Sequence, residues 1–175
     1  MKRVTLPIAS LFLILSISCK EDKASKSTSL EKKPEHEQMT KTDLASFSNE
    51  TSEKVFQNYQ LLRVALVNSD LGEAKNAAQK LTQGLEEGQE DLKSLSLAMM
   101  QADDMEKQRS LFSDLTEKVT PLLKETIEGG EIYKQYCPMA FEGKGGYWIS
   151  DVAEIRNPYF GDKMLTCGKV METIN

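Results

Sequence analysis

Apolar residues recur at helical spacing from Ser48 to Glu128, and this pattern limits the possible folds more than any other feature of the chain. Four such stripes follow one another, each on one face of a helix. Their members are Val55, Tyr59, Leu62 and Leu66; Leu71, Ala74, Ala78, Leu81 and Leu85; Leu92, Leu95, Met99 and Ala102; and Phe112, Leu115, Val119, Leu122 and Ile127. Helices joined by short connections pack as antiparallel neighbours. We therefore predict an all-α fold, with an up-down four-helix bundle over residues 46–130.

Capping and breaking residues fall between these stripes. The Asp-x-x-Glu spacing of an N-terminal capping box occurs at Asp70–Glu73 and again at Asp103–Glu106. Gly129-Gly130 ends the fourth helix. Pro121 lies inside the fourth stripe, so we expect that helix to kink or restart there. Methionines in register with the stripes, such as Met99, are expected to fill the core.

The first eighteen residues have the composition of a bacterial signal peptide. Lys2 and Arg3 precede an apolar run, Leu6 to Ile17, that is too short to span a bilayer as a helix. Ser18 then precedes Cys19, as in a lipoprotein signal, where the cysteine becomes the acylated N-terminus. We expect residues 1–18 to be removed and Cys19 to anchor the protein in the cell envelope, at the outer membrane. The alternative is ordinary secretion with Cys19 as an unmodified thiol.

Residues 19–45 are rich in Lys, Glu, Ser and Thr and have few large apolar side chains. Such a segment cannot bury enough surface to offset its ordering entropy, so we predict a flexible tether next to the lipid. The only histidine, His36, lies in this tether. The folded part therefore has no histidine base for a nucleophilic triad or a zinc-bound water, and we predict that the protein is not an enzyme.

The net charge argues against nucleic acid and anionic lipid as partners. The formal charge of the whole chain is −5, and loss of the segment containing Lys2 and Arg3 changes it to −7. A chain this acidic has no basic patch to neutralise phosphates, so we expect no binding of nucleic acid.

The C-terminal segment, residues 131–175, differs in kind from the helices. It holds seven of the twelve aromatic residues, and seven of the ten glycines lie between Gly129 and Gly168. We predict short irregular elements here, including a small two-stranded hairpin that pairs Tyr147–Ile149 with Val170–Ile174. This C-terminal tail can bury surface, so it forms part of the folded protein rather than a linker.

Two cysteines in this tail each have a methionine nearby. Cys137 and Met139 share a face of an extended segment, and Met164 and Cys167 share a face of a helical turn. Two thiolates and two thioethers together would select Cu(I) or Ag(I) over metals that prefer oxygen. The alternative is a disulfide between Cys137 and Cys167, because with Cys19 carrying lipid two cysteines remain in an oxidising compartment. Composition and compartment alone favour the disulfide.

The tail resembles the signature of a bacterial domain-of-unknown-function family. The resemblance rests on YKQYCPMAFEGKGGYWISD and EIRNPYFGDKMLTCGKV, and the preceding helices agree in pattern, notably at Arg109 and Phe112. Members occur as stand-alone lipoproteins and as extensions on periplasmic adaptor proteins of heavy-metal efflux systems. The residues that match the motif are Cys137, Pro138, Met139, Trp148, Asn157, Pro158, Tyr159, Gly161, Met164, Cys167 and Gly168. Tyr136 is a departure, since some relatives have histidine there.

The resemblance implies a helical bundle that carries the Cys-Pro-Met and Met-x-x-Cys elements and is linked to copper, silver or related cations. It therefore makes metal binding the leading hypothesis. On this hypothesis a lipid-anchored envelope protein binds Cu(I) or Ag(I) through Cys137, Met139, Met164 and Cys167, and buffers the ion or hands it to an efflux adaptor. Tyr136, Trp148 and Tyr159 would shield the site from water. The alternative is a structural or interaction module whose tail is stapled by the Cys137–Cys167 disulfide.

Overall fold

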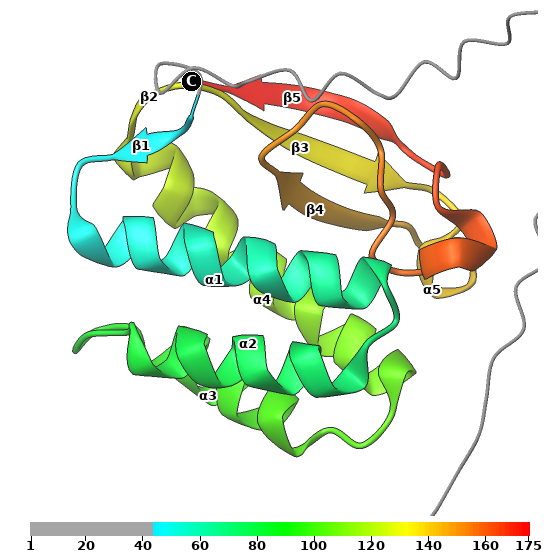
Figure 1. Cartoon of the computed structure of the whole chain (residues 1–175). Helices are drawn as coiled ribbons and strands as arrows, with labels where there is room; N and C mark the ends of the chain where they lie inside the picture. Colours follow the sequence, from blue (N-terminus) through cyan, green and yellow to red (C-terminus); the bar gives the residue numbers. More distant parts are fainter. Residues whose placement is uncertain (1–43) are drawn as a thin grey trace, which may run out of the picture. The chain divides into compact units, whose positions relative to one another are not determined.

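Residues 44–175 are described by the computed structural model shown in Figure 1. The predicted signal peptide, the expected lipid attachment at Cys19, His36 and all but the last two residues of the predicted tether lie outside the described residues. The main helices are α1 (Glu50–Val67), α2 (Leu71–Gln83), α3 (Glu90–Gln101) and α4 (Met105–Thr126). The remaining elements are β1 (Ser46–Phe47), β2 (Ile127–Gly129), β3 (Ile132–Cys137), the short turn α5 (Ala140–Gly143), β4 (Gly146–Ser150), the 3₁₀ turn η1 (Gly161–Met164) and β5 (Lys169–Ile174). Among the described residues no helix has both the length and the apolar run that a membrane crossing requires.

The four helices pack together as the apolar stripes predict. Each helix lies against the next, and α1 also packs against α4. The residues of the first stripe are fully buried, as are Met99, Phe112, Leu115 and Val119. Met99 is therefore core filler, as predicted. α4 continues through the exposed Pro121 as one helix, so the expected restart there is wrong.

Side-chain caps set where three of the helices begin. The Asn49 carboxamide oxygen accepts a hydrogen bond from the Ser52 backbone N–H at the start of α1, at 2.8 Å. Asp70 caps α2 through the Glu73 N–H, as the sequence predicts. The prediction for α4 is wrong by one residue: Asp104 accepts from the Lys107 N–H, while Asp103 forms an ion pair with Lys75.

The tail forms a three-stranded antiparallel sheet in the order β4-β3-β5. The fold is therefore mixed α/β and mostly helical, and the all-α expectation is wrong in this respect. The predicted pairing of Tyr147–Ile149 with Val170–Ile174 is also wrong, because β3 lies between β4 and β5 and bonds to both. The β-branched and aromatic residues of β3 (Ile132, Tyr133, Tyr136) favour a strand and pack well in the central strand of the sheet.

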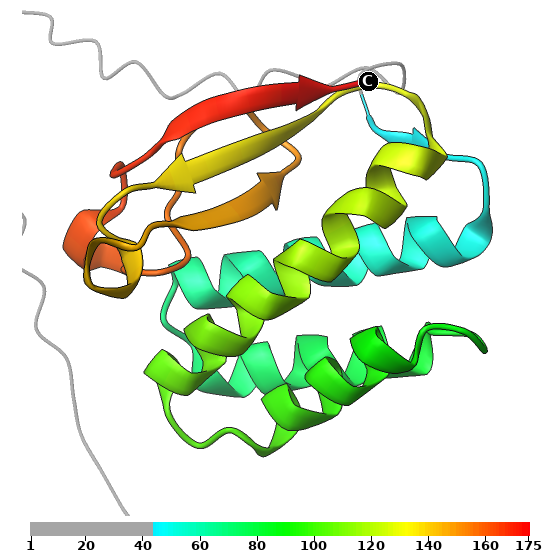
Figure 2. The same cartoon turned by 180° about the vertical axis from the view of Figure 1, so that it is seen from behind.

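The sheet lies over α1 and α4, and α2 and α3 lie on the far side of that helix pair (Figures 1 and 2). β4 is joined to the helices by a chain of hydrogen bonds. The Ile149 N–H donates to the Tyr59 hydroxyl at 3.1 Å, and this hydroxyl is 2.7 Å from the Thr116 hydroxyl. The Thr116 hydroxyl donates its hydrogen to the Phe112 carbonyl, so in the contact with Thr116 the Tyr59 hydroxyl is the donor.

A second connection runs from α1 to the end of β4. The Arg63 guanidinium bonds to the Gln60 carboxamide and to the Asp151 carboxylate, and Gln60 in turn donates to the Ile149 carbonyl. Arg63 is almost fully buried, so its charge depends on Asp151 for compensation. These contacts hold β4, and with it the rest of the sheet, in a fixed position on the bundle.

Candidate functional site

The two cysteines of the tail meet at one end of the sheet. Cys137 is the last residue of β3 and is fully buried, and Cys167 precedes β5 and is half-buried. Their Sγ atoms are 3.0 Å apart. Two segments separated along the chain therefore bring their sulfur atoms into contact, which both the metal and the disulfide hypotheses require.

The turn before β5 places Cys167 against Cys137. The Asn157 side chain donates to the Cys167 carbonyl at 2.9 Å, and the Cys167 N–H donates to the Met164 carbonyl at 3.0 Å. Gly168 then passes so close to the sheet that an added Cβ would lie 2.9 Å from the Trp148 ring and 3.0 Å from the Tyr136 carbonyl oxygen. Only a residue without a side chain fits there, so Gly168 permits the approach of the two sulfur atoms.

Both methionines of the proposed ligand set reach Cys167 through their backbones. The Met139 backbone N–H lies close enough to the Cys167 sulfur to lower the pKa of that thiol, and the Met164 carbonyl accepts a hydrogen bond from the Cys167 N–H. Met164 is half-buried at the end of η1, whereas Met139 is 53% exposed. The structure therefore brings all four residues to one place, with the Met139 side chain on the solvent side.

The three expected shielding residues lie on two faces of the sheet. Trp148 pairs with Gln135 and so shares a face with Cys137, and it is fully buried. Tyr159 packs edge-on against Trp148, with ring centroids 5.9 Å apart, and its hydroxyl donates to the Tyr147 carbonyl. Tyr136 precedes Cys137 in the strand, points to the opposite face and packs against Tyr147, with ring centroids 4.5 Å apart and the rings tilted by 38°. Trp148 and Tyr159 therefore lie on the face of the cysteine pair, and Tyr136 does not.

The contact between the thiols changes the acidity of Cys167. The pKa of Cys167 is raised above its ordinary value, mainly by the hydrogen bond with Cys137 and then by burial. The Met139 N–H acts in the opposite direction. A proton shared between two sulfur atoms is harder to remove, so any ion that binds both thiolates must displace it.

The remaining ligand types are scarce near this pair. Among residues 44–175 no group of three or more His, Cys, Asp and Glu side chains could hold a metal ion. A zinc site, which normally has four such nitrogen, sulfur or oxygen ligands, does not match this arrangement. Met139 and Met164, whose backbone atoms lie next to Cys167, carry thioethers, which select soft ions.

Gln135 has a supporting role that the sequence did not reveal. Its carboxamide nitrogen lies 2.9 Å from the Val152 carbonyl, 3.1 Å from that of Ala153 and 3.3 Å from that of Glu154. The side chain thus holds the segment after β4 against the central strand, beside Trp148. A glutamine in a strand gives no sequence signal of its distant partners, so only the fold identifies this function.

Residues 55–129, from α1 to β2, match a protein family described as "Protein of unknown function (DUF3347)", so this part of the chain is a domain of that family. The matched stretch covers the helical bundle and ends before Cys137. No curated protein and no solved structure matches the chain. The family assignment therefore rests on the helices, and the cysteine pair has to be interpreted from its own geometry.

Proposed function

We propose that this protein is a lipid-anchored, non-enzymatic protein of the cell envelope that binds Cu(I) or Ag(I). Cys137 and Cys167 supply two thiolates, and Met139 and Met164 supply thioethers. The protein buffers the ion or hands it to an adaptor of a heavy-metal efflux system. The observation that carries this proposal is the 3.0 Å contact between Sγ of Cys137 and Sγ of Cys167, with the backbones of both methionines next to Cys167.

The separation of the sulfur atoms sets how far the site must open. With a metal–thiolate bond of about 2.3 Å, two thiolates on one ion are about 3.8 Å apart at a tetrahedral angle and about 4.6 Å apart in line. From 3.0 Å, this is an opening of about 0.8 to 1.6 Å. Cys137 is fixed in β3, so most of that movement falls to Cys167 and the turn before β5.

Titration with Cu(I) tests the proposal. The full-length protein, purified in detergent, reduced and kept anaerobic, is titrated with Cu(I) held by bicinchoninate, and binding is followed by competition and by Trp148 fluorescence. Trp148 is the only tryptophan and lies on the face of the cysteine pair, so it reports occupancy directly. We expect one ion per chain in the wild-type protein and no binding in Cys137→Ser or Cys167→Ser. The stoichiometry should be the same after the reductant has been removed, which shows that the reductant itself does not bind the ion.

Methionine variants separate a four-ligand site from a simple dithiolate. Met139→Leu and Met164→Leu are expected to weaken Cu(I) binding while preserving the apolar volume. Met171→Leu is the matched control, because Met171 is similarly exposed, at 47%, but lies in β5 away from the Met139 backbone contact. Equal affinity in all three variants would remove Met139 and Met164 from the ligand set, and failure of the wild-type protein to take up Cu(I) would refute the metal-binding function.

The same contact also favours a second candidate function, an interaction module stapled by a disulfide. A bond of about 2.05 Å requires the sulfur atoms to approach by about 1 Å, which is no larger than the opening that metal needs. Closing the loop between Cys137 and Cys167 would stabilise the fold by about 3–4 kcal/mol in the chain-entropy model. Exposed apolar side chains on the sheet, Tyr147, Val170 and Met171, would then face a partner.

Mass spectrometry of unreduced protein distinguishes the two functions. A bridged protein is lighter by two hydrogen atoms. A bridge in protein isolated without reductant, together with no Cu(I) uptake after reduction, supports the interaction module. Free thiols that bind Cu(I) stoichiometrically support the metal site.

A further inference from the structure

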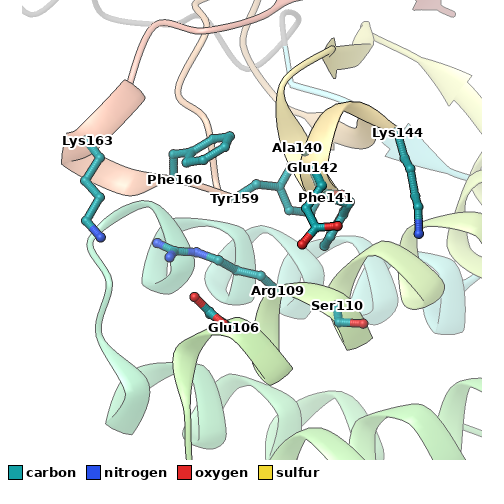
Figure 3. Close-up of a pocket in the computed structure, with 10 residues that line it drawn as sticks. All are labelled: Glu106, Arg109, Ser110, Ala140, Phe141, Glu142, Lys144, Tyr159, Phe160 and Lys163. Atoms are coloured by element: carbon teal, nitrogen blue, oxygen red, sulfur yellow. The ribbon is translucent and has the colours of Figure 1, made fainter.

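A cavity of about 470 Å³ lies between α4 and the two segments that lead to the cysteines. Its floor is the first part of α4, with Glu106, Arg109 and Ser110 (Figure 3). One wall is the segment from Ala140 to Lys144, and the other runs from Tyr159 to Lys163. The volume falls within the range of small-molecule sites, about 300–1,000 Å³.

Arg109 places a partly desolvated positive charge in this cavity. Its Nε donates to the Pro158 carbonyl at 2.9 Å, and one terminal nitrogen donates to the Ser69 hydroxyl at 3.0 Å and lies 3.4 Å from the Leu66 carbonyl. These neutral partners fix the guanidinium. Within residues 44–175 it forms no ion pair, and burial lowers its pKa. The exposed Glu106 carboxylate acts on Arg109 through space without an ion pair, so this half-buried cation, whose hydrogen bonds go to neutral groups, can still pair with an anion.

Aromatic side chains supply the apolar part of the cavity. The Phe141 ring packs edge-on against Tyr159, with centroids 5.0 Å apart, and Phe160 lines the same wall as Tyr159. Phe141 and Glu142 both have positive φ, at 52° and 59°, which is unfavourable for residues other than glycine. This left-handed turn directs Phe141 toward the cavity (Figure 3) and is the kind of backbone strain that the rest of a fold must compensate.

The charges around the cavity are balanced in a way that limits the ligand. Lys144 and Lys163 join Arg109 on the positive side, and Glu106 and Glu142 are negative. The excess is one positive charge among the lining residues. A singly charged anion is therefore favoured over a dianion such as phosphate, which would face uncompensated repulsion from the two carboxylates.

We propose that this cavity binds a small organic monocarboxylate with an aromatic or branched apolar body. The carboxylate is held by the Arg109 guanidinium and the Lys163 ammonium group. The apolar body lies among Phe141, Tyr159 and Phe160. The site depends on none of the thiols, so it stands or falls independently of the metal-binding function.

Equilibrium dialysis with radiolabelled phenylacetate tests the proposal on the reduced full-length protein in detergent. We expect saturable uptake that unlabelled phenylacetate displaces. The matched competitors 2-phenylethanol and phenethylammonium have the same body without the negative charge, and we expect each to compete at least roughly tenfold less well. Inorganic phosphate has the charge without the body and is expected to compete weakly.

Two charge variants locate the site. Lys163→Glu changes an exposed side chain and is expected to weaken phenylacetate binding at least roughly threefold, whereas Lys80→Glu, an exposed lysine on α2, is expected to have no effect. Arg109→Gln is expected to abolish phenylacetate binding. Arg109 also supports the fold, so if Arg109→Gln does not fold, the Lys163→Glu result decides the test. Absence of saturable uptake, equal competition by the alcohol or by phosphate, or equal binding by Lys163→Glu and Lys80→Glu overturns the proposal.

Discussion

Replacing Tyr59 with phenylalanine tests whether the sheet is held on the bundle by the hydrogen-bond chain described above. Tyr59 is fully buried, and its hydroxyl accepts from the Ile149 N–H and donates to Thr116. The substitution keeps the ring stacked on Phe112, whose centroid is 4.9 Å away, so the packing is preserved. What is lost is the acceptor for the buried Ile149 N–H, together with one bond to Thr116.

A buried donor left without an acceptor costs about 1–3 kcal/mol, and we expect Tyr59→Phe to lower the free energy of unfolding by about 1.5–3 kcal/mol. The assay is urea unfolding of the reduced protein, followed by Trp148 fluorescence and by circular dichroism. Tyr133→Phe is the matched control, because its hydroxyl donates to Glu131 at the surface and its removal should cost less than about 0.5 kcal/mol. Equal effects of the two substitutions would refute the reasoning.

A double-mutant cycle with Thr116→Val measures the coupling directly. The two side chains touch through their hydroxyls at 2.7 Å, so the paired effects should depart from additivity by about 0.5 kcal/mol or more. Hydrogen exchange of the Ile149 amide gives an independent reading, since it should quicken in Tyr59→Phe. An unchanged exchange rate would show that another group satisfies this N–H.

Three further predictions concern pH and the turn before β5. Burial raises the pKa of Tyr59 and of Tyr159 in the folded protein. Their contribution to stability is therefore complete below about pH 10, where tyrosine in the unfolded chain begins to ionise. Above that pH the free energy of unfolding should fall by up to about 1.4 kcal/mol per pH unit for each tyrosine. Because the pKa of Cys167 is raised, this thiol must release its proton when Cu(I) binds at neutral pH. That release alone should increase the apparent affinity by up to about tenfold per pH unit until the thiol ionises in the free protein. Gly168→Ala should destabilise the fold by about 1–3 kcal/mol and alter Trp148 fluorescence, because the new Cβ would overlap the Trp148 ring; thermal unfolding measures the first effect.

The helices could be predicted from the sequence because their information is local. The stripe containing Tyr59 and Leu66 defines a buried face by spacing alone, and Asp70 marks where a helix begins. The cap of α4 was predicted one residue too early because Asp103 and Asp104 are adjacent and equally suited to cap a helix. Spacing cannot tell which of them extends its backbone, whereas in the structure Asp103 instead pairs with Lys75 on α2.

The sheet could not be predicted because strand order is set by contacts between distant residues. β3 was overlooked since Ile132–Cys137 alternates only weakly between buried and half-buried positions. By composition alone, β4 and β5 are plausible partners for each other, whereas in the fold β3 lies between them and Tyr59 and Gln60 bond to β4 from the bundle. The meeting of Cys137 and Cys167 was expected from the chemistry of the two thiols alone. No pattern in the neighbouring sequence indicated the hydrogen bonds of Gln135 or the close contact of Gly168 with Trp148.

The cysteine pair and the cavity are mechanically connected through two short segments. Cys137 continues through Pro138 and Met139 directly into the wall that begins at Ala140, and the wall that ends at Lys163 continues through Met164 to Cys167. A change of about 1 Å in the separation of the sulfur atoms, which either an ion or a disulfide requires, has to be absorbed by these segments. The wall before Cys167 is also held by the Asn157 side chain, and Arg109 bonds to the adjacent Pro158 carbonyl. A movement of Cys167 therefore reaches the guanidinium at the floor of the cavity through two hydrogen bonds and the covalent link between Asn157 and Pro158.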